Sequence, residues 1–184
     1  MKHACTLLSL AAVLAVTLIA VPGPAAAELT ADTLREILLR EHARDLADGY
    51  LEEASRHDDP AVRARALEAL GKIGDRGTVG LVSEGLTDDD ESVRMASAFA
   101  LGQIGSAAAE PMLRDAYAKE AYAAVRAVIL PALGKVGTED AIVFLGDILL
   151  ANHPEDAAHA AMGLGHMGRR GMDMETAGKA LTMG

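Results

Sequence analysis

Methionine and histidine gather near the C-terminal end of the sequence, where their side chains could bind copper. His159, Met162 and His166 fall at i, i+3 and i+7, a spacing that would place them on one side of a helix. Met172 and Met174 follow a few residues later. Thioether and imidazole groups suit Cu(I), so copper binding is one hypothesis for this cluster. The other interpretation is that methionine, a flexible side chain, fills a loosely packed end of the fold.

Carboxylates recur at a fixed step and form a second candidate feature. Glu84, Asp115 and Asp147 are separated by 31 and 32 residues. We expect them to form an acidic column across neighbouring helices, one that would steer a basic partner. The alternative is that they belong to an ordinary solvated face.

Apolar residues recur at a related step on a different face. Phe99, Pro131 and Met162 are also 32 and 31 residues apart, and Met95 precedes Phe99 by about one helical turn. The register predicts that these positions point away from the core. Exposed apolar residues in a row are typical of a protein-binding surface, and a lone aromatic ring suits the role of anchor. Phe99 is therefore the predicted anchor.

Residues for covalent catalysis form no recognisable set in this sequence. Cys5 is the only cysteine, and it lies near the N-terminus. The serines have no nucleophile-elbow context, and no glycine-rich phosphate loop follows a strand. Paired acids such as Asp58-Asp59 sit in expected turns, where acids precede helices for capping reasons. We expect a chain that is not an enzyme and needs no cofactor.

A six-residue motif that occurs four times, called here the phrase, indicates the elements that must position these side chains. "ALGKIG", "ALGQIG", "ALGKVG" and "GLGHMG" begin at Ala69, Ala100, Ala132 and Gly163. Their first glycines are 31, 32 and 31 residues apart. A period of this length indicates a stack of repeated structural units.

Each unit is predicted to be a helix, a turn and a second helix. Pro60 can open the first helix of repeat one, and Gly71 and Gly74 are expected to end it. The residues after the four phrases suggest caps for the second helices, namely Asp75, Ser106 and Thr138 in the first three repeats. No segment shows the two-residue alternation of a strand. The fold class is therefore all-α, an α-solenoid of about four helix pairs.

The boundaries follow from the phrase. The repeats span about residues 58–88, 89–119, 120–151 and 152–184, behind an N-terminal helical cap at 28–57. The fourth repeat departs from the pattern, because Asp156 and Ala157 stand where the earlier repeats have Val and Arg. This departure is typical of a capping repeat or a frayed end.

The pattern D-x-x-V-R followed by A-L-G-K-I-G resembles the short HEAT-like repeats of the phycobilisome-lyase type, over roughly residues 58–170. The family's Asp/Arg pair is matched by Asp59 with Arg63 and by Asp90 with Arg94, whereas repeat three has Tyr122 and Arg126. The resemblance implies an α-solenoid that binds proteins, with such pairs linking neighbouring turns. A lyase-associated subunit is a minor alternative, since an exported chain would not meet cytoplasmic light-harvesting proteins.

The N-terminus has the three parts of a secretory signal. Lys2 is followed by an uncharged, mostly apolar run, a Pro-Gly-Pro break and small residues at Ala25 to Ala27. We expect residues 1–27 to be removed, giving a periplasmic or secreted protein that contacts a membrane only if the signal stays uncleaved. The formal net charge of −10 disfavours nucleic acid as a partner. The expected function is a non-catalytic scaffold or adaptor for a protein partner whose identity the sequence does not give.

Overall fold

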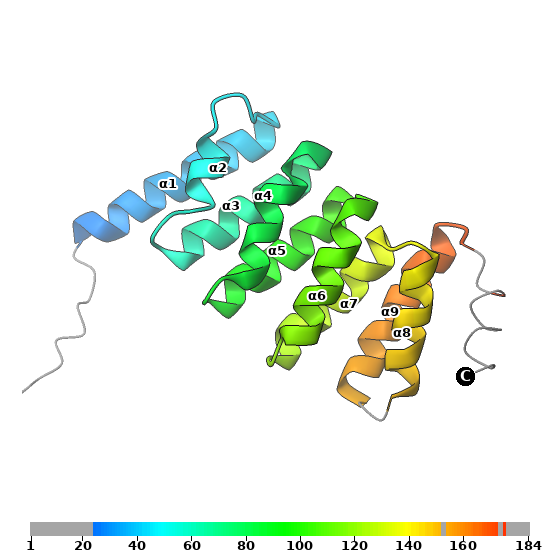
Figure 1. Ribbon diagram of the computed structural model, residues 1–184. Coiled ribbons are helices and arrows are strands. Elements are labelled where there is room, and N and C mark those ends of the chain that lie inside the picture. The colour runs from blue at the N-terminus through cyan, green and yellow to red at the C-terminus, as the bar shows by residue number, and fades with distance from the viewer. Residues whose placement is uncertain (1–23, 152–153, 173–174, 176–184) are drawn as a thin grey trace, which may run out of the picture.

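The computed structural model describes residues 24–151, 154–172 and 175. Within these residues the regular structure is entirely helical, and the helices stack in pairs along one direction (Figure 1). The first helices of the pairs form one layer and the second helices lie in front of them. The predicted all-α solenoid of HEAT-like helix pairs is confirmed. The predicted signal at 1–27 lies almost wholly outside the described residues.

The elements follow the period of the sequence. The first helices are α3 (Pro60–Ile73), α5 (Glu91–Ile104), α7 (Ala123–Val136) and α9 (Pro154–Arg169). The second helices are α4 (Val79–Glu84), α6 (Glu110–Lys119) and α8 (Glu139–Leu150). Short 3₁₀ turns η1 (Arg76–Thr78) and η2 (Gly85–Thr87) flank α4, and η3 (Ala107–Ala109) precedes α6. At the N-terminal end lie α1 (Pro24–Ala43) and α2 (Tyr50–Ala54).

Aspartate begins two of the first helices in the same way. The Asp59 carboxylate accepts a hydrogen bond from Ala61 N, and the Asp90 carboxylate accepts one from Ser92 N. Each bond satisfies an N–H that the helix itself leaves unpaired. Tyr122 holds the same position before α7 and makes no such side-chain bond. Repeat three therefore lacks a cap that repeats one and two possess.

The first glycine of the phrase has a role different from the predicted one. Gly71 lies inside α3 and does not end it. Its role is to let α5 approach closely, since it has no side chain. A Cβ built at Gly71 would lie 2.5 Å from Ala100 Cα, far inside normal contact distance. Gly102 likewise faces Ala132 of α7, and Gly134 faces Gly163 of α9. The phrase thus recurs because each glycine marks the closest approach of consecutive first helices.

The second glycine of the phrase ends the helix in the first two repeats. Gly74 and Gly105 have φ of 75° and 67°, the left-handed conformation that glycine adopts without strain. Gly137 ends α7 with an extended backbone instead.

The predicted caps of the second helices are only partly present. The Asp75 carboxylate accepts a bond from Gly77 N, but Ser106 and Thr138 make no side-chain cap bond. The buried Glu110 carboxylate instead accepts the Thr138 N–H at 2.7 Å, so a neighbouring repeat satisfies that helix.

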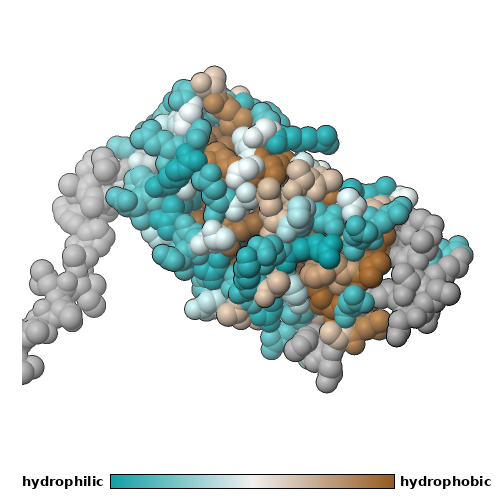
Figure 2. All heavy atoms as spheres, in the orientation of Figure 1, coloured by the Kyte–Doolittle hydropathy of each residue, from teal (hydrophilic) through white to brown (hydrophobic). Residues whose placement is uncertain are grey.

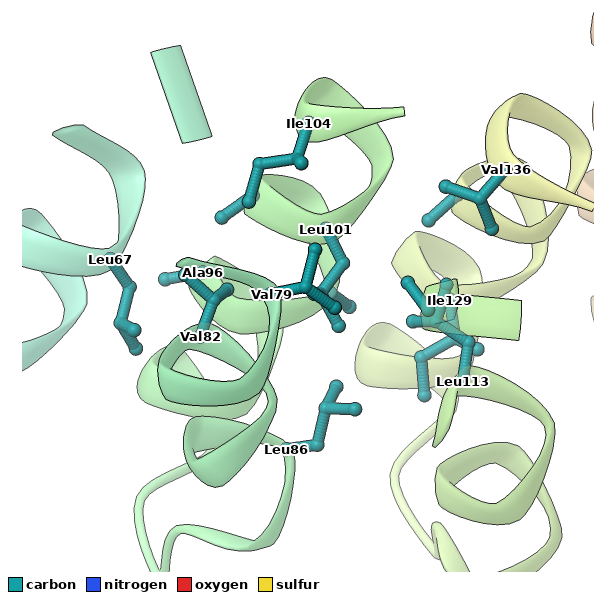
Figure 3. Close-up of a cluster of buried hydrophobic side chains, with 14 of the residues drawn as sticks. Leu67, Val79, Val82, Leu86, Ala96, Leu101, Ile104, Leu113, Ile129 and Val136 are labelled. Carbon is teal, nitrogen blue, oxygen red and sulfur yellow. The ribbon is translucent and has the colours of Figure 1, made fainter. Parts of the chain in front are cut away.

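The core runs between the two layers. The phrase leucines Leu70, Leu101 and Leu133 are at most 1% exposed. Figure 3 shows side chains from α3 to α7 meeting in this space, among them Leu113 of α6 and Ile129 of α7. The apolar faces of successive pairs therefore bury one another, as a solenoid requires.

The two ends of the stack differ. α1 packs on α3, where Glu41 pairs with Arg65 and Lys72, and Ile37 is fully buried. At the C-terminal end α9 packs on α7 and α8. The expected second helix of the fourth repeat lies almost entirely outside the described residues. No helix in the described part of the chain combines the length and apolar character needed to cross a membrane.

Candidate protein-binding surfaces

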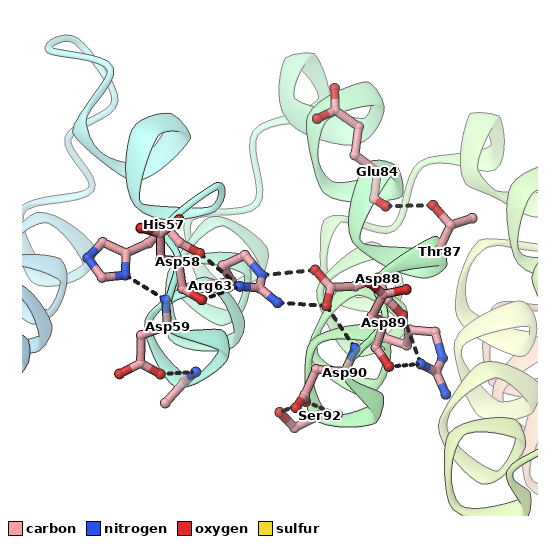
Figure 4. A network of polar contacts seen from close by, with 12 residues as sticks. His57, Asp58, Asp59, Arg63, Glu84, Thr87, Asp88, Asp89, Asp90 and Ser92 are labelled. Atoms are coloured by element: carbon pink, nitrogen blue, oxygen red, sulfur yellow. Dashed lines mark hydrogen bonds and ion pairs between the residues drawn. The ribbon is translucent and has the colours of Figure 1, made fainter. Parts of the chain in front are cut away.

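Partly buried ion pairs join each repeat to the next along one edge of the solenoid. Arg63 donates from Nε and Nη2 to the two carboxylate oxygens of Asp88, at 2.9 and 2.8 Å (Figure 4). Its Nη1 donates to the carbonyls of His57 and Asp58. One guanidinium therefore holds its own repeat and the following one in a fixed register.

The same arrangement recurs in the next two repeats. Arg94 binds Glu120, with the shorter bond at 2.8 Å from Nε, and Arg126 binds Asp156 at 3.0 Å. In both cases Nη1 again bonds carbonyls five and six residues earlier in the chain. Asp59 and Asp90 cap helices and do not pair with these arginines. The arginine partners, which lie 25 to 30 residues away, were missed by the sequence prediction.

In the arginine ladder, the three pairs of Arg63 with Asp88, Arg94 with Glu120 and Arg126 with Asp156, the first two acids have a lowered pKa. The hydrogen bonds from Arg63 lower the pKa of Asp88, outweighing its partial burial. For Glu120, burial favours the neutral acid, but the bonds from Arg94 and from Tyr122 N outweigh burial and lower the pKa. The ladder is therefore formed at neutral pH and supports a stiff scaffold.

Asp156 belongs to this ladder although it interrupts the repeat pattern. It stands where the other repeats have a buried valine, and its carboxylate is itself buried. Besides Arg126 it accepts a hydrogen bond of 3.0 Å from the Tyr117 hydroxyl. Burial and this bond raise the pKa of Tyr117 to about 12. In repeat four, Asp156 therefore takes the place of the buried valine and supplies the last acid of the ladder.

The predicted apolar row is only partly exposed. Phe99 is 36% exposed and Met162 53% exposed, whereas Met95 packs partly against the core and Pro131 is half-buried inside α7. The Lys135 ammonium lies 5.7 Å from the centre of the Phe99 ring. Phe99 therefore presents part of its ring to solvent beside a cation, which helps to hold the ring in place.

The three carboxylates of the acidic column are all exposed, but two of them are paired. Glu84 binds Arg56 at 3.1 Å and Asp115 binds Lys119 at 2.6 Å. Asp147 lies on the exposed side of α8. Exposed pairs of this kind contribute little to stability, so the column retains carboxylates that a partner could engage.

Three of the candidate copper ligands, His159, Met162 and His166, lie on α9. The Arg169 Nη2 atom is 2.8 Å from His166 Nδ1, and burial together with Arg169 and Lys135 lowers the pKa of His166. Met172 packs against the core and Met174 lies outside the described residues. The Nδ1 atom of His159 is buried and has no hydrogen-bond partner among the described residues. Copper binding by this cluster stays a prediction.

A groove that the sequence prediction missed lies between the second helices of repeats one and two. Its volume is about 480 Å³, and it reaches from Leu86 at the end of α4 to Met112 and Asp115 on α6. Tyr122, which is 56% exposed, forms part of its wall. The available signal was Tyr122 itself, an aromatic residue at a repeat position that holds aspartate elsewhere.

Apolar side chains also reach the surface at the C-terminal end of the second-helix layer. Figure 2 shows brown apolar side chains over α8, where Val143, Leu149 and Leu150 are between 39% and 68% exposed.

Comparison with known proteins agrees with this geometry. Residues 47–133 match the family model for HEAT repeats. Among solved structures, the chain is similar to one in the complex of CpcE and CpcF of phycocyanin lyase from Nostoc sp. PCC7120, with a TM-score of 0.64 and 22% identity. The match covers 78% of this chain and 61% of that chain, so this chain spans about three fifths of the length of its structural relative. No curated protein matches the sequence.

The expectation that the chain is not an enzyme is contradicted by the structural match. The similar chain is part of a phycocyanin lyase complex, so this kind of scaffold occurs in enzyme assemblies. The fold therefore gives no ground for setting aside a lyase-related role.

The family model covers the first pairs of helices, and the crossing glycines and the arginine ladder continue the same geometry through α9. Residues 47–133 are therefore HEAT repeats, and the described part of the chain has the fold of an α-solenoid.

Proposed function

We propose that this HEAT-repeat protein is a scaffold that binds a partner protein in the periplasm or outside the cell. The observation that carries the proposal is Phe99, a ring that stays 36% exposed on the side of α5 predicted to point outward. A partly exposed aromatic side chain on a rigid helix is a good anchor, because little conformational entropy is lost when it is buried.

The acidic column would act on the approach of the partner. Glu84, Asp115 and Asp147 are exposed, and charges of this kind raise association rates more than they hold a complex together. The partner is then expected to carry a basic surface, in line with the formal net charge of −10.

Capture of the partner from cell-envelope extract tests the proposal. Phe99→Ala should weaken capture while leaving the circular dichroism spectrum unchanged. Simultaneous charge reversal of the three acids should mainly change the salt dependence of capture. Leu150→Ala is the matched control, because Leu150 is 68% exposed on a different helix. Capture that survives Phe99→Ala and is abolished by the charge reversal would place the binding surface on the acidic face.

The compartment has its own test. If residues 1–27 are a cleaved signal, the intact mass of the protein from the envelope fraction should correspond to a chain beginning at Glu28. A mass that retains residues 1–27 would replace the exported soluble protein by one anchored through its N-terminus.

A second candidate is a subunit of an enzyme complex of the lyase type. The likeness to a chain of the CpcE–CpcF complex of phycocyanin lyase supports it. Crosslinking in cells followed by mass spectrometry separates the two candidates. A second HEAT-repeat chain as the main crosslinked partner would favour the complex subunit, and a partner of another fold would favour the adaptor.

A further inference from the structure

The groove between α4 and α6 exists because two repeat positions carry smaller side chains there than between α6 and α8. In the later groove, Tyr117 and Phe144 meet edge to face with ring centres 5.6 Å apart. These residues stand fifteen and ten positions after their phrase glycines. The same positions in the earlier groove hold Leu86 and Met112, and both line the open space. Two rings therefore fill the later groove at the position where the earlier one is left accessible.

The apolar floor of the groove is bordered by carboxylates. Asp89 and Asp115 both line the groove, and both are exposed. The Asp115 carboxylate pairs with Lys119, and the two side chains are 64% and 70% exposed. Such a pair exchanges readily with another cation, because water already solvates both groups.

The other charged groups beside the groove are already committed to the ladder. Arg94 donates to Glu120 and to two backbone carbonyls, and the Asp88 carboxylate is held by Arg63. These groups are therefore not free to neutralise Asp89 and Asp115. The groove keeps a local excess of negative charge over an apolar floor.

Tyr122 adds an aromatic wall at the expense of a helix cap. Asp59 and Asp90 accept capping bonds at this repeat position, and Tyr122 does not. Its ring is 56% exposed, and its hydroxyl has no hydrogen-bond partner within the described residues. The ring lines the groove, where the Arg94 guanidinium lies 5.5 Å from its centre, a contact that contributes about as much as the lost cap.

We propose that this groove binds an arginine side chain presented by the partner protein. The aliphatic stem of arginine would lie on Leu86 and Met112, and the guanidinium would reach Asp89 and Asp115 and pack against the Tyr122 ring. Arginine fits better than lysine because its planar group both stacks on rings and pairs with two carboxylate oxygens. The inference rests on the proposed function in taking the partner to be a protein, and it names the chemistry that the partner offers.

Titration of the full chain with a short peptide tests the site without requiring the partner. The probe is acetyl-Gly-Arg-Gly-amide, and the matched control peptide has citrulline, which is uncharged, in place of arginine. The readout is the nuclear magnetic resonance signal of isotope-labelled methionine methyl groups, with the Met112 signal assigned by its loss in Met112→Leu. The Met112 signal should shift saturably with the arginine peptide in the millimolar range, and the citrulline peptide should leave it nearly unmoved.

Two substitutions locate the contacts. Tyr122→Asn removes the ring and supplies a capping side chain, so the fold is kept while affinity should fall by about two- to five-fold. Asp115→Asn should weaken binding by about two- to five-fold, whereas Asp147→Asn, at the same repeat position outside the groove, should leave it unchanged. Equal effects of the two aspartate variants would show an unspecific charge effect and overturn the site.

Other outcomes also overturn the proposal. A Met112 signal that responds equally to both peptides would make the groove an apolar site without a role for the cation. A signal that shifts on dilution of the protein alone would assign the groove to a second copy of this chain. These results are distinct from failure of the proposed function, since the chain could still capture its partner through Phe99 when the arginine peptide does not bind.

Discussion

Adding one methyl group at Gly71 should destabilise the protein, against the usual effect of replacing glycine in a helix. In an exposed helix interior, Gly→Ala stabilises by about 1 kcal/mol, because alanine restricts the unfolded chain and favours the helix. At Gly71 the new Cβ would lie 2.5 Å from Ala100 Cα and 2.7 Å from Ala100 Cβ. Carbon atoms in contact are about 3.5–4.0 Å apart, so α3 and α5 must separate by about 1 Å. The obstructing atoms belong to the backbone and a methyl group, which cannot rotate away.

The expected magnitude follows from these two opposing effects. Overpacking of this kind costs about 3 kcal/mol at the upper end of its usual range, and the gain in helix propensity returns about 1 kcal/mol. Gly71→Ala should therefore lower the free energy of unfolding by about 2 kcal/mol. Gly165 is the matched control, because it holds the same place in its phrase but a Cβ there would meet only Arg169 Nη1, at 3.8 Å. Gly165→Ala should raise the free energy of unfolding by about 0.5–1 kcal/mol.

Urea denaturation followed by far-ultraviolet circular dichroism measures both changes on one scale. Gly102 provides an intermediate case, since its Cβ would lie 3.0 Å from Ala132 Cβ, and Gly102→Ala should fall between the two variants. The unfolded chain gains the same methyl group in all three variants, so the differences report the packing of the first helices. If Gly71→Ala and Gly165→Ala changed stability in the same direction, the glycines would not mark helix crossings and the explanation of the repeated phrase would be wrong.

Three further outcomes are expected. Leu133→Ala should cost about 2–5 kcal/mol in urea denaturation because Leu133 is fully buried, whereas Asp115→Asn should stay within about 0.5 kcal/mol. The pKa of Asp88 is lowered by the hydrogen bonds from Arg63, so the stability that Asp88 contributes is present at neutral pH. That stability is lost as pH falls below the ordinary carboxyl pKa of about 4. The Asp88→Asn protein should therefore be less stable at pH 7 and lose less stability in acid. The pKa of Tyr117 is raised to about 12, so its contribution is complete below pH 10 and is lost as pH rises from 10 to 12. Tyr117→Phe should remove that alkaline loss in a pH series of melts, and an unchanged alkaline limb would contradict the assignment.

The fold could be predicted because the same pattern of apolar residues and glycines recurs in every repeat. The phrase leucine is apolar in all four copies, and the structure buries Leu70, Leu101 and Leu133. Helical spacing and the period of about 31 residues then allow few architectures other than a stack of helix pairs. The prediction that Gly71 ends its helix was wrong because glycine is permissive in two ways. It accepts a left-handed backbone, and it also lets two helices approach, and only the neighbouring helix distinguishes these roles.

The ladder partners were harder to predict because they lie in the following repeat. Asp88 belongs to the run Asp88-Asp89-Asp90-Glu91, and composition alone does not say which of these acids meets Arg63. One regularity was available, since Asp88 and Glu120 both stand two residues before the N-cap residue of a first helix. Asp156 breaks even that rule, because it reaches Arg126 from within α9. Its role depends on the position of a helix relative to its neighbour, which the sequence does not state.

In a repeat protein the structural positions recur, so departures from the repeat mark where a second requirement acts. Asp156 departs from the pattern and is explained by its ion pair and its bond to Tyr117, which leaves no function to assign. Tyr122 departs as well, but it loses a capping bond and gains only a cation contact with Arg94, 5.5 Å from the ring centre. Surface contacts of this kind contribute about as much as the lost cap, so stability alone gives no reason for the exchange. Tyr122 borders a groove in which Leu86 and Met112 stand where Tyr117 and Phe144 pack together one repeat later, so its departure from the repeat coincides with accessible apolar surface. A binding site accounts for this coincidence, whereas the loss of a helix cap alone does not.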